Sequence, residues 1–97
     1  MARPKLDDAA IARALEALPQ WAREGDKIVR RLEAPSFRAA VSLVDRIADV
    51  AEGADHHPDL HLSWRRLVIE LTTHDSGGIT ARDVHLARVI EDVIADG

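Results

Sequence analysis

The strongest constraint on the fold is an alternation of apolar and polar residues between positions 59 and 71, broken only by the pair Arg65–Arg66 and by the apolar Val68. Every second residue is apolar from 60 to 64, and the alternation resumes from 67 to 71 after Arg65–Arg66. Because the side chains of a β-strand point alternately to its two faces, this spacing predicts two strands that each bury one face. Arg65–Arg66 would form the turn, although two-residue turns usually contain Asn-Gly or Asp-Gly. The segment therefore predicts an antiparallel hairpin.

The apolar pattern also predicts the register of this hairpin. With Arg65–Arg66 as a two-residue turn, Leu62 faces Ile69 and all the apolar pairs lie on one side. The same register, extended to the open end, places His57 opposite His74. A longer turn would shift this pairing by about two positions, so the two histidines would stay neighbours.

Three further segments have helical spacing. Apolar residues recur there every three or four positions, as on one face of a helix. The segments start at Asp7 or Asp8, at Pro35–Ser36 and at Thr80, and their apolar stripes are Ile11, Leu15 and Leu18; Phe37, Ala40, Val41, Val44, Ala48 and Ala51; and Leu86, Val89, Ile90 and Val93. Pro19 and Gly53 are expected to end the first two helices. Thr80 and Asp83 approximate a capping box for the third.

The remaining regular segment is a second hairpin, with strands at Trp21–Arg23 and Lys27–Glu33 around Gly25–Asp26. The order is then helix, hairpin, helix, hairpin, helix. This order predicts an α+β fold (αββαββα) in which a four-stranded antiparallel sheet carries three helices packed on one face. A chain of 97 residues is expected to form a single domain, residues 1–97. Trp21 and Trp64 are expected in its core.

Composition narrows the class of function. The chain has no cysteine, which excludes disulfides, thiol nucleophiles and zinc–thiolate sites. Its formal net charge of −4 argues against nucleic acid as the main partner. No apolar run is long enough for a transmembrane helix, and the start MARPKLDDAA lacks the apolar core of a signal peptide. We expect a cytoplasmic protein that does not bind membranes.

Histidines gather in one short stretch, GADHHPDLHLSW at residues 53–64. Three of the five histidines of the chain lie within six positions there. The predicted hairpin brings the start of this stretch close to the end of the following strand. The result is a polar cluster where a helix end, a strand start and a strand end meet. Its members are Asp55, His56, His57, Thr72, Thr73, His74 and Asp75.

Three interpretations of the cluster are open. A metal site would need His57 and His61 to converge, but Pro58 and the strand pattern break the helix that would align them, and no third ligand is evident. The histidines could also be solvated without chemical role, as expected for His61 in a surface pair with Glu70. We favour proton transfer, because imidazoles supply both acids and bases near neutral pH. No serine or cysteine nucleophile adjoins them, which favours hydration, dehydration or tautomerisation.

The spacing of these residues resembles a known family signature. Glu52-Gly-Ala-Asp-His56-His57-Pro58 is followed after five residues by Trp64, after nine more by His74 and after eight more by Asp83. This pattern resembles the pterin-4a-carbinolamine dehydratases, and the order of elements is similar from about residue 6 to residue 95. The resemblance implies an α+β fold of four antiparallel strands and three helices, in dimers or in tetramers of paired dimers.

The resemblance also implies an activity. Family members dehydrate 4a-hydroxytetrahydropterin, such as 4a-hydroxytetrahydrobiopterin, to quinonoid dihydropterin, which recycles the pterin for aromatic amino acid hydroxylases. It implies that His57 holds the substrate and that His56 and His74 act as acids toward the departing hydroxyl. Segments 55–57 and 72–75 would line the pterin site, with no metal and no bound cofactor. Asp55 would orient an imidazole or accept a pterin N–H.

Two residues of the pattern need separate comment. Leu60 stands where some relatives carry an aromatic residue, which could lower the affinity for a pterin ring. Asp83 belongs to the signature, but its place in the capping box accounts for it as a structural residue. His85 is assigned no role.

A second class of function stays open. The same fold also serves as a non-catalytic protein-binding module, either a dimerisation cofactor of a transcription factor or an assembly factor that has lost the dehydratase histidines. This chain retains His56, His57 and His74, which favours the enzyme. The expected partners are a small pterin, further copies of the chain as homodimer or homotetramer, and an aromatic amino acid hydroxylase.

Overall fold

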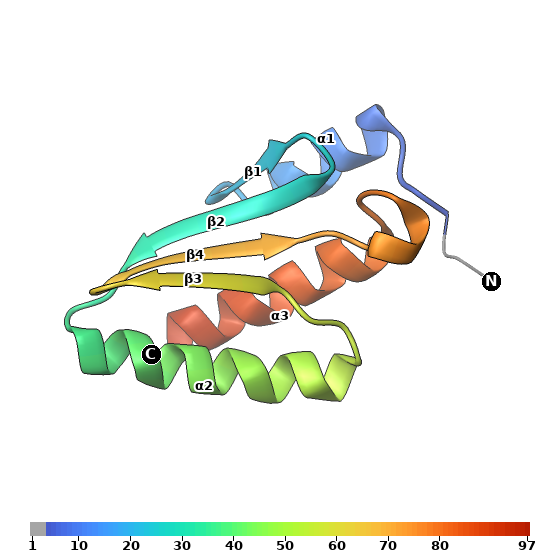
Figure 1. The fold of residues 1–97 in the computed structure, drawn as a ribbon. Coiled ribbons are helices and arrows are strands. Elements are labelled where there is room, and N and C mark those ends of the chain that lie inside the picture. The colour runs from blue at the N-terminus through green and yellow to red at the C-terminus, as the bar shows by residue number, and fades with distance from the viewer. Residues whose placement is uncertain (1–3) are drawn as a thin grey trace.

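The chain forms the predicted series of helices and hairpins. The computed structural model describes residues 4–97; residues 1–3 of the expected domain 1–97 lie outside the described residues. Figure 1 shows the arrangement of the elements. They are α1 (Asp8–Glu16), β1 (Trp21–Glu24), β2 (Lys27–Glu33), α2 (Phe37–Ala54), β3 (Asp59–Ser63), β4 (Arg66–Leu71), the short 3-10 helix η1 (His74–Ser76) and α3 (Ala81–Asp96).

The four strands form one antiparallel sheet in the order β1-β2-β4-β3. The two hairpins are therefore joined through β2 and β4, and β3 is an edge strand. Helices α2 and α3 cross the same face of this sheet (Figure 1). The predicted α+β fold of three helices and a four-stranded sheet is confirmed.

The helices and the covered face of the sheet share one hydrophobic core. Trp21 was expected there and is 4% exposed. Its indole N–H donates to Glu91 at 2.8 Å, and the same carboxylate oxygen pairs with Arg30 at 2.6 Å, so the polar end of the ring is satisfied. The core consists of Ile11, Leu18, Trp21, Ile28, Leu43, Ile47, Leu67, Ile69, Leu71, Ile79, Val84, Leu86, Ala87 and Ile90.

The predicted turn of the second hairpin is wrong by one residue. Ser63 pairs with Arg66, so the turn is Trp64–Arg65 and not Arg65–Arg66. Trp64 adopts a left-handed conformation with φ 58°. The true register and the predicted one both keep the apolar residues on one face, so alternation alone could not distinguish them. A hydrogen bond from Ala34 N–H to Arg65 O at 2.8 Å holds the turn against the end of β2.

The expected burial of Trp64 is also wrong. As a turn residue it projects from the end of the hairpin and is 60% exposed. The guanidinium of Arg65 lies 4.6 Å from the centroid of its ring, a cation–π contact. Leu62, its neighbour on the edge strand, is also partly exposed.

The buried face of α2 is rotated relative to the predicted stripe. Ala40 and Ala51 are buried as expected, but Phe37 and Val41 are exposed and Leu43 and Ile47 take their place. The long run of apolar residues is wider than one helix face, which is why the pattern left the rotation ambiguous. Helix α2 also continues through Gly53, the predicted end, to Ala54.

The helix starts agree with the sequence. The Asp7 carboxylate accepts from Ala10 N–H at 2.8 Å, which identifies Asp7 as the cap of α1. Ser36 caps α2 through Ala39 N–H. The capping box of α3 is present in full. These caps satisfy N–H groups that a helix leaves unpaired.

The uncovered face of the sheet carries an ion-pair cluster at Glu70. Its carboxylate lies 2.9 Å from Lys27 Nζ and 3.3 Å from His61 Nε2, so the predicted His61–Glu70 pair is confirmed. The hydrogen bond from Lys27, with a smaller one from His61, lowers the pKa of Glu70 although burial opposes the shift. Because the folded state favours the carboxylate, this group stabilises the fold above its unfolded pKa.

We therefore predict that Glu70→Gln lowers the free energy of unfolding near neutral pH and has no effect in acid. The contribution of Glu70 is lost as the pH falls through its lowered folded pKa. Urea unfolding of both proteins across the acid range measures this difference. Glu16→Gln, at an exposed helix position, is the control. A Glu70→Gln deficit that stays constant in strong acid would contradict the linkage.

Candidate active site

A pocket of about 250 Å³ opens where the end of α2 meets the segment that joins β4 to α3. This volume lies below the ~300–1,000 Å³ of typical drug-sized ligand sites and suits a single small ring system. All seven residues of the predicted polar cluster line it, together with one that was not predicted, Arg82. The lining residues are Asp55, His56, His57, Thr72, Thr73, His74, Asp75 and Arg82.

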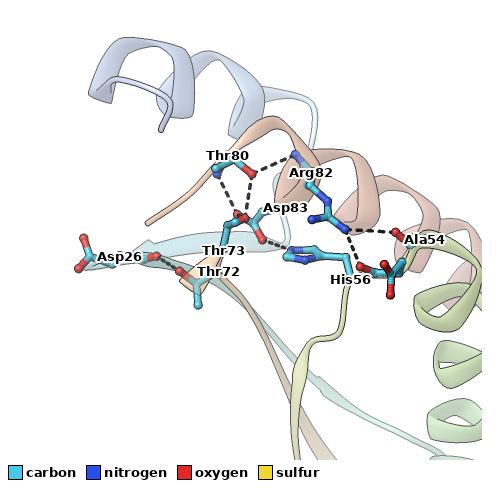
Figure 2. A network of polar contacts seen from close by, with 9 residues as sticks. Asp26, Ala54, His56, Thr72, Thr73, Thr80, Arg82 and Asp83 are labelled. Carbon is cyan, nitrogen blue, oxygen red and sulfur yellow. Dashed lines mark hydrogen bonds and ion pairs between the residues drawn. The ribbon is translucent and has the colours of Figure 1, made fainter. Parts of the chain in front are cut away.

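The first wall is the chain reversal at the end of α2. Asp55 is the C-cap in a left-handed conformation, with φ 49° and ψ 42°. The His56 N–H donates to Ala51 O at 3.2 Å and closes the reversal. Arg82 of α3 reaches across to donate to the carbonyls of Asp55 at 2.5 Å and Ala54 at 3.4 Å (Figure 2). The ends of α2 and the start of α3 are thereby tied together.

The second wall is the segment that follows β4. The Thr72 hydroxyl donates to Asp26 O at 2.6 Å, next to the first hairpin (Figure 2). Thr73 and Gly78 form an isolated bridge that closes a small loop around η1. Gly77 has φ 72°, which a glycine adopts without steric cost. This loop presents His74 and Asp75 at the rim of the pocket.

The three histidines are held to different degrees. His56 has a side chain that is 10% exposed, and its Nε2 lies 2.6 Å from Asp83 Oδ1. His57 is 58% exposed, and its Nε2 lies 2.5 Å from the exposed Glu52 carboxylate. His74 is exposed, and its imidazole has no hydrogen-bond partner among residues 4–97. Only His56 is therefore fixed by a buried group.

The predicted direct pairing of His57 with His74 is not found. The observed register, extended by two positions, places His57 opposite Thr72, and His74 begins η1 beyond the strand. The difference follows from the turn at Trp64–Arg65. The two histidines nevertheless line the same pocket.

Asp83 has more contacts than the sequence predicted. Its structural role is confirmed: Oδ2 accepts from Thr80 N–H at 2.8 Å and from the Thr73 hydroxyl at 2.8 Å. Its other oxygen is bonded to His56. Its spacing in the signature was the available signal for this second contact, but the capping box already accounted for the residue. Arg82 carried no such signal.

Two findings concern other classes of site. Within residues 4–97, no group of three or more histidine or acidic side chains is arranged to hold a metal ion. No helix in this described part combines the length and the apolar character needed to cross a membrane.

Known proteins with similar sequences belong to a single family. Residues 4–93 match the family described as pterin 4 alpha carbinolamine dehydratase. A protein of Nocardia farcinica is 51% identical over 88 residues, 91% of this chain and 93% of its own length. One of Thermomicrobium roseum is 46% identical over 89 residues, 92% of this chain and 96% of its own. Both are named as candidate pterin-4-alpha-carbinolamine dehydratases.

A solved structure agrees with the fold. The crystal structure of a transcriptional coactivator/pterin dehydratase from Brucella melitensis superposes with a TM-score of 0.87 at 28% sequence identity, covering 92% of this chain and 97% of that one. The chain described here belongs to the pterin-4a-carbinolamine dehydratase family.

The reversal at Asp55 generates a stability prediction. A left-handed conformation costs a residue with a Cβ about 1 kcal/mol, less for Asp and nothing for Gly. We expect Asp55→Gly to be at least as stable as wild type, and Asp55→Ala to be less stable by about 1 kcal/mol. Urea unfolding midpoints measure both. A glycine variant no more stable than the alanine variant would contradict the backbone argument, and a glycine variant less stable than wild type would show that the carboxylate also stabilises this corner.

Proposed function

We propose that this protein dehydrates a 4a-hydroxytetrahydropterin, such as 4a-hydroxytetrahydrobiopterin, to the quinonoid dihydropterin. One observation carries the proposal: the histidines of the family signature, His56 and His57 from one segment and His74 from another, line a single pocket. The family to which the chain belongs and the names of its relatives support the same reaction.

The reaction requires two proton transfers. The C4a–O bond breaks as its oxygen takes a proton and leaves as water, and N5 loses its proton as the C4a=N5 double bond forms. We infer that His56 and His74 act as the acids toward the departing hydroxyl, while His57 holds the ring. Positioned acids and bases of this kind each accelerate a reaction by about 10²–10⁴-fold.

The other lining residues would bind the ring. Asp55 offers a carboxylate to a pterin N–H, and Asp75 offers a second one at the rim of the pocket. Thr72 and Thr73 use their hydroxyl protons within the protein, which leaves oxygen lone pairs for the ligand. Leu60 lines an adjacent apolar cavity with His57, so its lack of an aromatic ring would weaken only one side of the binding site.

We further propose the physiological setting. The enzyme would act as a single domain in the cytoplasm and regenerate the pterin cofactor that aromatic amino acid hydroxylases oxidise. Such a hydroxylase is its expected source of substrate and a candidate partner.

The assay of the reaction is the decay of freshly generated 4a-hydroxytetrahydropterin, followed by ultraviolet absorbance. We expect wild type to accelerate the decay and His56→Ala and His74→Ala to lower kcat, by up to about 10²–10⁴-fold for a lost acid. His57→Ala should chiefly raise KM.

His85→Ala is the matched control, because His85 lies on α3 and lines a different cavity. It should leave the rate unchanged. A decay rate with wild-type protein that is no higher than the rate in buffer would contradict the dehydratase proposal.

A second candidate function is protein binding. The Brucella melitensis relative is titled a transcriptional coactivator as well as a pterin dehydratase. This chain also exposes large apolar residues where α2 starts and the β3–β4 turn ends, which lie at the same end of the molecule (Figure 1). These residues are Phe37, Val41, Leu62 and Trp64. We propose that this apolar end and the open edge of β3 bind a second copy of the chain in a homodimer or homotetramer.

This assembly predicts that Leu62→Glu lowers the molar mass in solution, because a charge buried between apolar surfaces is strongly unfavourable. Light scattering after size exclusion measures the mass. Ala12→Glu, on the exposed side of α1, should leave it unchanged. A wild-type protein of monomer mass at high concentration would contradict the assembly. The apolar end would then be a surface for a different protein.

A further inference from the structure

Asp83 is a fully buried carboxylate whose contacts are all with groups that can donate a hydrogen bond. Its exposed fraction is 0%. The Thr80 N–H and the Thr73 hydroxyl donate to Oδ2, and His56 Nε2 faces Oδ1 at 2.6 Å (Figure 2). Among the described residues, no carbonyl or second carboxylate, which could only accept, is directed at it. These are the contacts that an ionised carboxylate makes, because it accepts hydrogen bonds and donates none.

The hydroxyl protons around Asp83 have one consistent direction. Arg82 N–H donates to Thr80 Oγ1 at 3.2 Å. Since the Thr73 proton goes to Asp83, the 2.8 Å contact between the hydroxyls of Thr80 and Thr73 is donated by Thr80. Both threonine hydroxyls therefore donate within this series of hydrogen bonds, and neither proton is left for Oδ1 of Asp83. That oxygen has one partner, the imidazole of His56.

The contact determines which nitrogen of His56 carries the proton. Facing a carboxylate oxygen, Nε2 must be the donor, so a neutral His56 is the Nε2–H tautomer. The side chain is 10% exposed, so water has little access to offer an alternative. Among the described residues, Nδ1 has no partner and is the nitrogen left for a ligand in the pocket that His56 lines.

We propose that Asp83 is a positioning residue that holds a proton on Nε2 of His56 and so makes Nδ1 the atom that exchanges a proton with the substrate: the imidazolium donates from Nδ1, and the neutral Nε2–H tautomer left behind accepts there. The catalytic part of this inference rests on the proposed function. Asp83 itself does not line the pocket and acts through His56. A carboxylate that orients an imidazole in this way is a recurring device of acid–base sites.

Capping alone does not explain the arrangement. The cap uses Oδ2, through Thr80 N–H. Oδ1 is not needed for the helix, yet it is buried and directed at His56. The same carboxylate thus joins the start of α3, the segment after β4 through Thr73, and the segment after α2 through His56.

Asp83→Asn separates the two roles. If the amide oxygen takes the place of Oδ2, it still accepts from Thr80 and Thr73, and the cap is kept. The NH2 group then faces His56 Nε2, which must accept, so the proton moves to Nδ1. We expect ¹⁵N NMR to show His56 protonated at Nε2 in wild type and at Nδ1 in the variant. We also expect kcat to fall roughly 10–100-fold with little change in KM.

Thr80→Ala is the matched control. It removes the hydroxyl that bonds Arg82 N–H and Thr73 but keeps the Thr80 backbone N–H and the Asp83–His56 contact. It should lower the unfolding midpoint while His56 keeps its wild-type tautomer and the folded protein keeps its kcat. Stability and tautomer are thereby measured apart.

The outcomes are distinct. A neutral wild-type His56 that carries its proton on Nδ1 overturns the inference without any variant, even if Asp83→Asn does not fold. An Asp83→Asn protein that loses activity only in proportion to its unfolded fraction overturns the positioning role. A wild type without dehydratase activity refutes the proposed function instead, while the NMR spectrum still decides the tautomer.

Discussion

The candidate site depends on one buried charge. Asp83 lies at the start of α3, but its oxygens bind donors from two other parts of the chain, Thr73 after β4 and His56 after α2. A buried carboxylate is costly unless each oxygen is hydrogen-bonded, and loss of one donor leaves the charge uncompensated. The three segments are therefore constrained to meet at this point. The two walls of the pocket are held at a fixed separation as a consequence.

The sheet and the helices place the end of α2, the end of β4 and the start of α3 next to one another, where the contacts of Asp83 connect them. The second hairpin opens toward the end of α2, and its two strands lead into the segments that carry the histidines. Arg82 adds a second tie between α3 and the carbonyls of Ala54 and Asp55. The core residues below the sheet do not enter the pocket. Their role is to hold α2 and α3 against one face, so that the end of one helix meets the start of the other.

The sequence was sufficient for the architecture because its periodic patterns and caps are local. Asp7, Ser36 and Thr80 cap the helices as their positions predict. The hairpin turn was misplaced because a shift between Arg65–Arg66 and Trp64–Arg65 keeps every apolar residue on the same face. The predicted burial of Trp64 was wrong for the same reason, because the residue lies in the turn.

The site was predicted only in part, because some of its contacts are local in sequence and others depend on tertiary structure. The polar cluster was found because its members adjoin in sequence and the hairpin brings the two halves together, whichever of the two registers is adopted. Arg82 could not be found, since its contacts to backbone carbonyls leave no pattern in side-chain chemistry. Asp83 was assigned to the cap alone because one local contact sufficed to explain it. Its second contact joins residues 27 positions apart and depends on tertiary structure.

The two candidate functions occupy opposite ends of the molecule. The pocket lies at the end of α2, and the exposed Phe37 and Val41 lie at its start. An α-helix rises about 1.5 Å per residue, so a helix of 18 residues separates these ends by roughly 27 Å. A partner bound at the apolar end would not cover the histidines. Retention of the three histidines therefore gives no evidence against a binding role, and a protein partner gives none against catalysis.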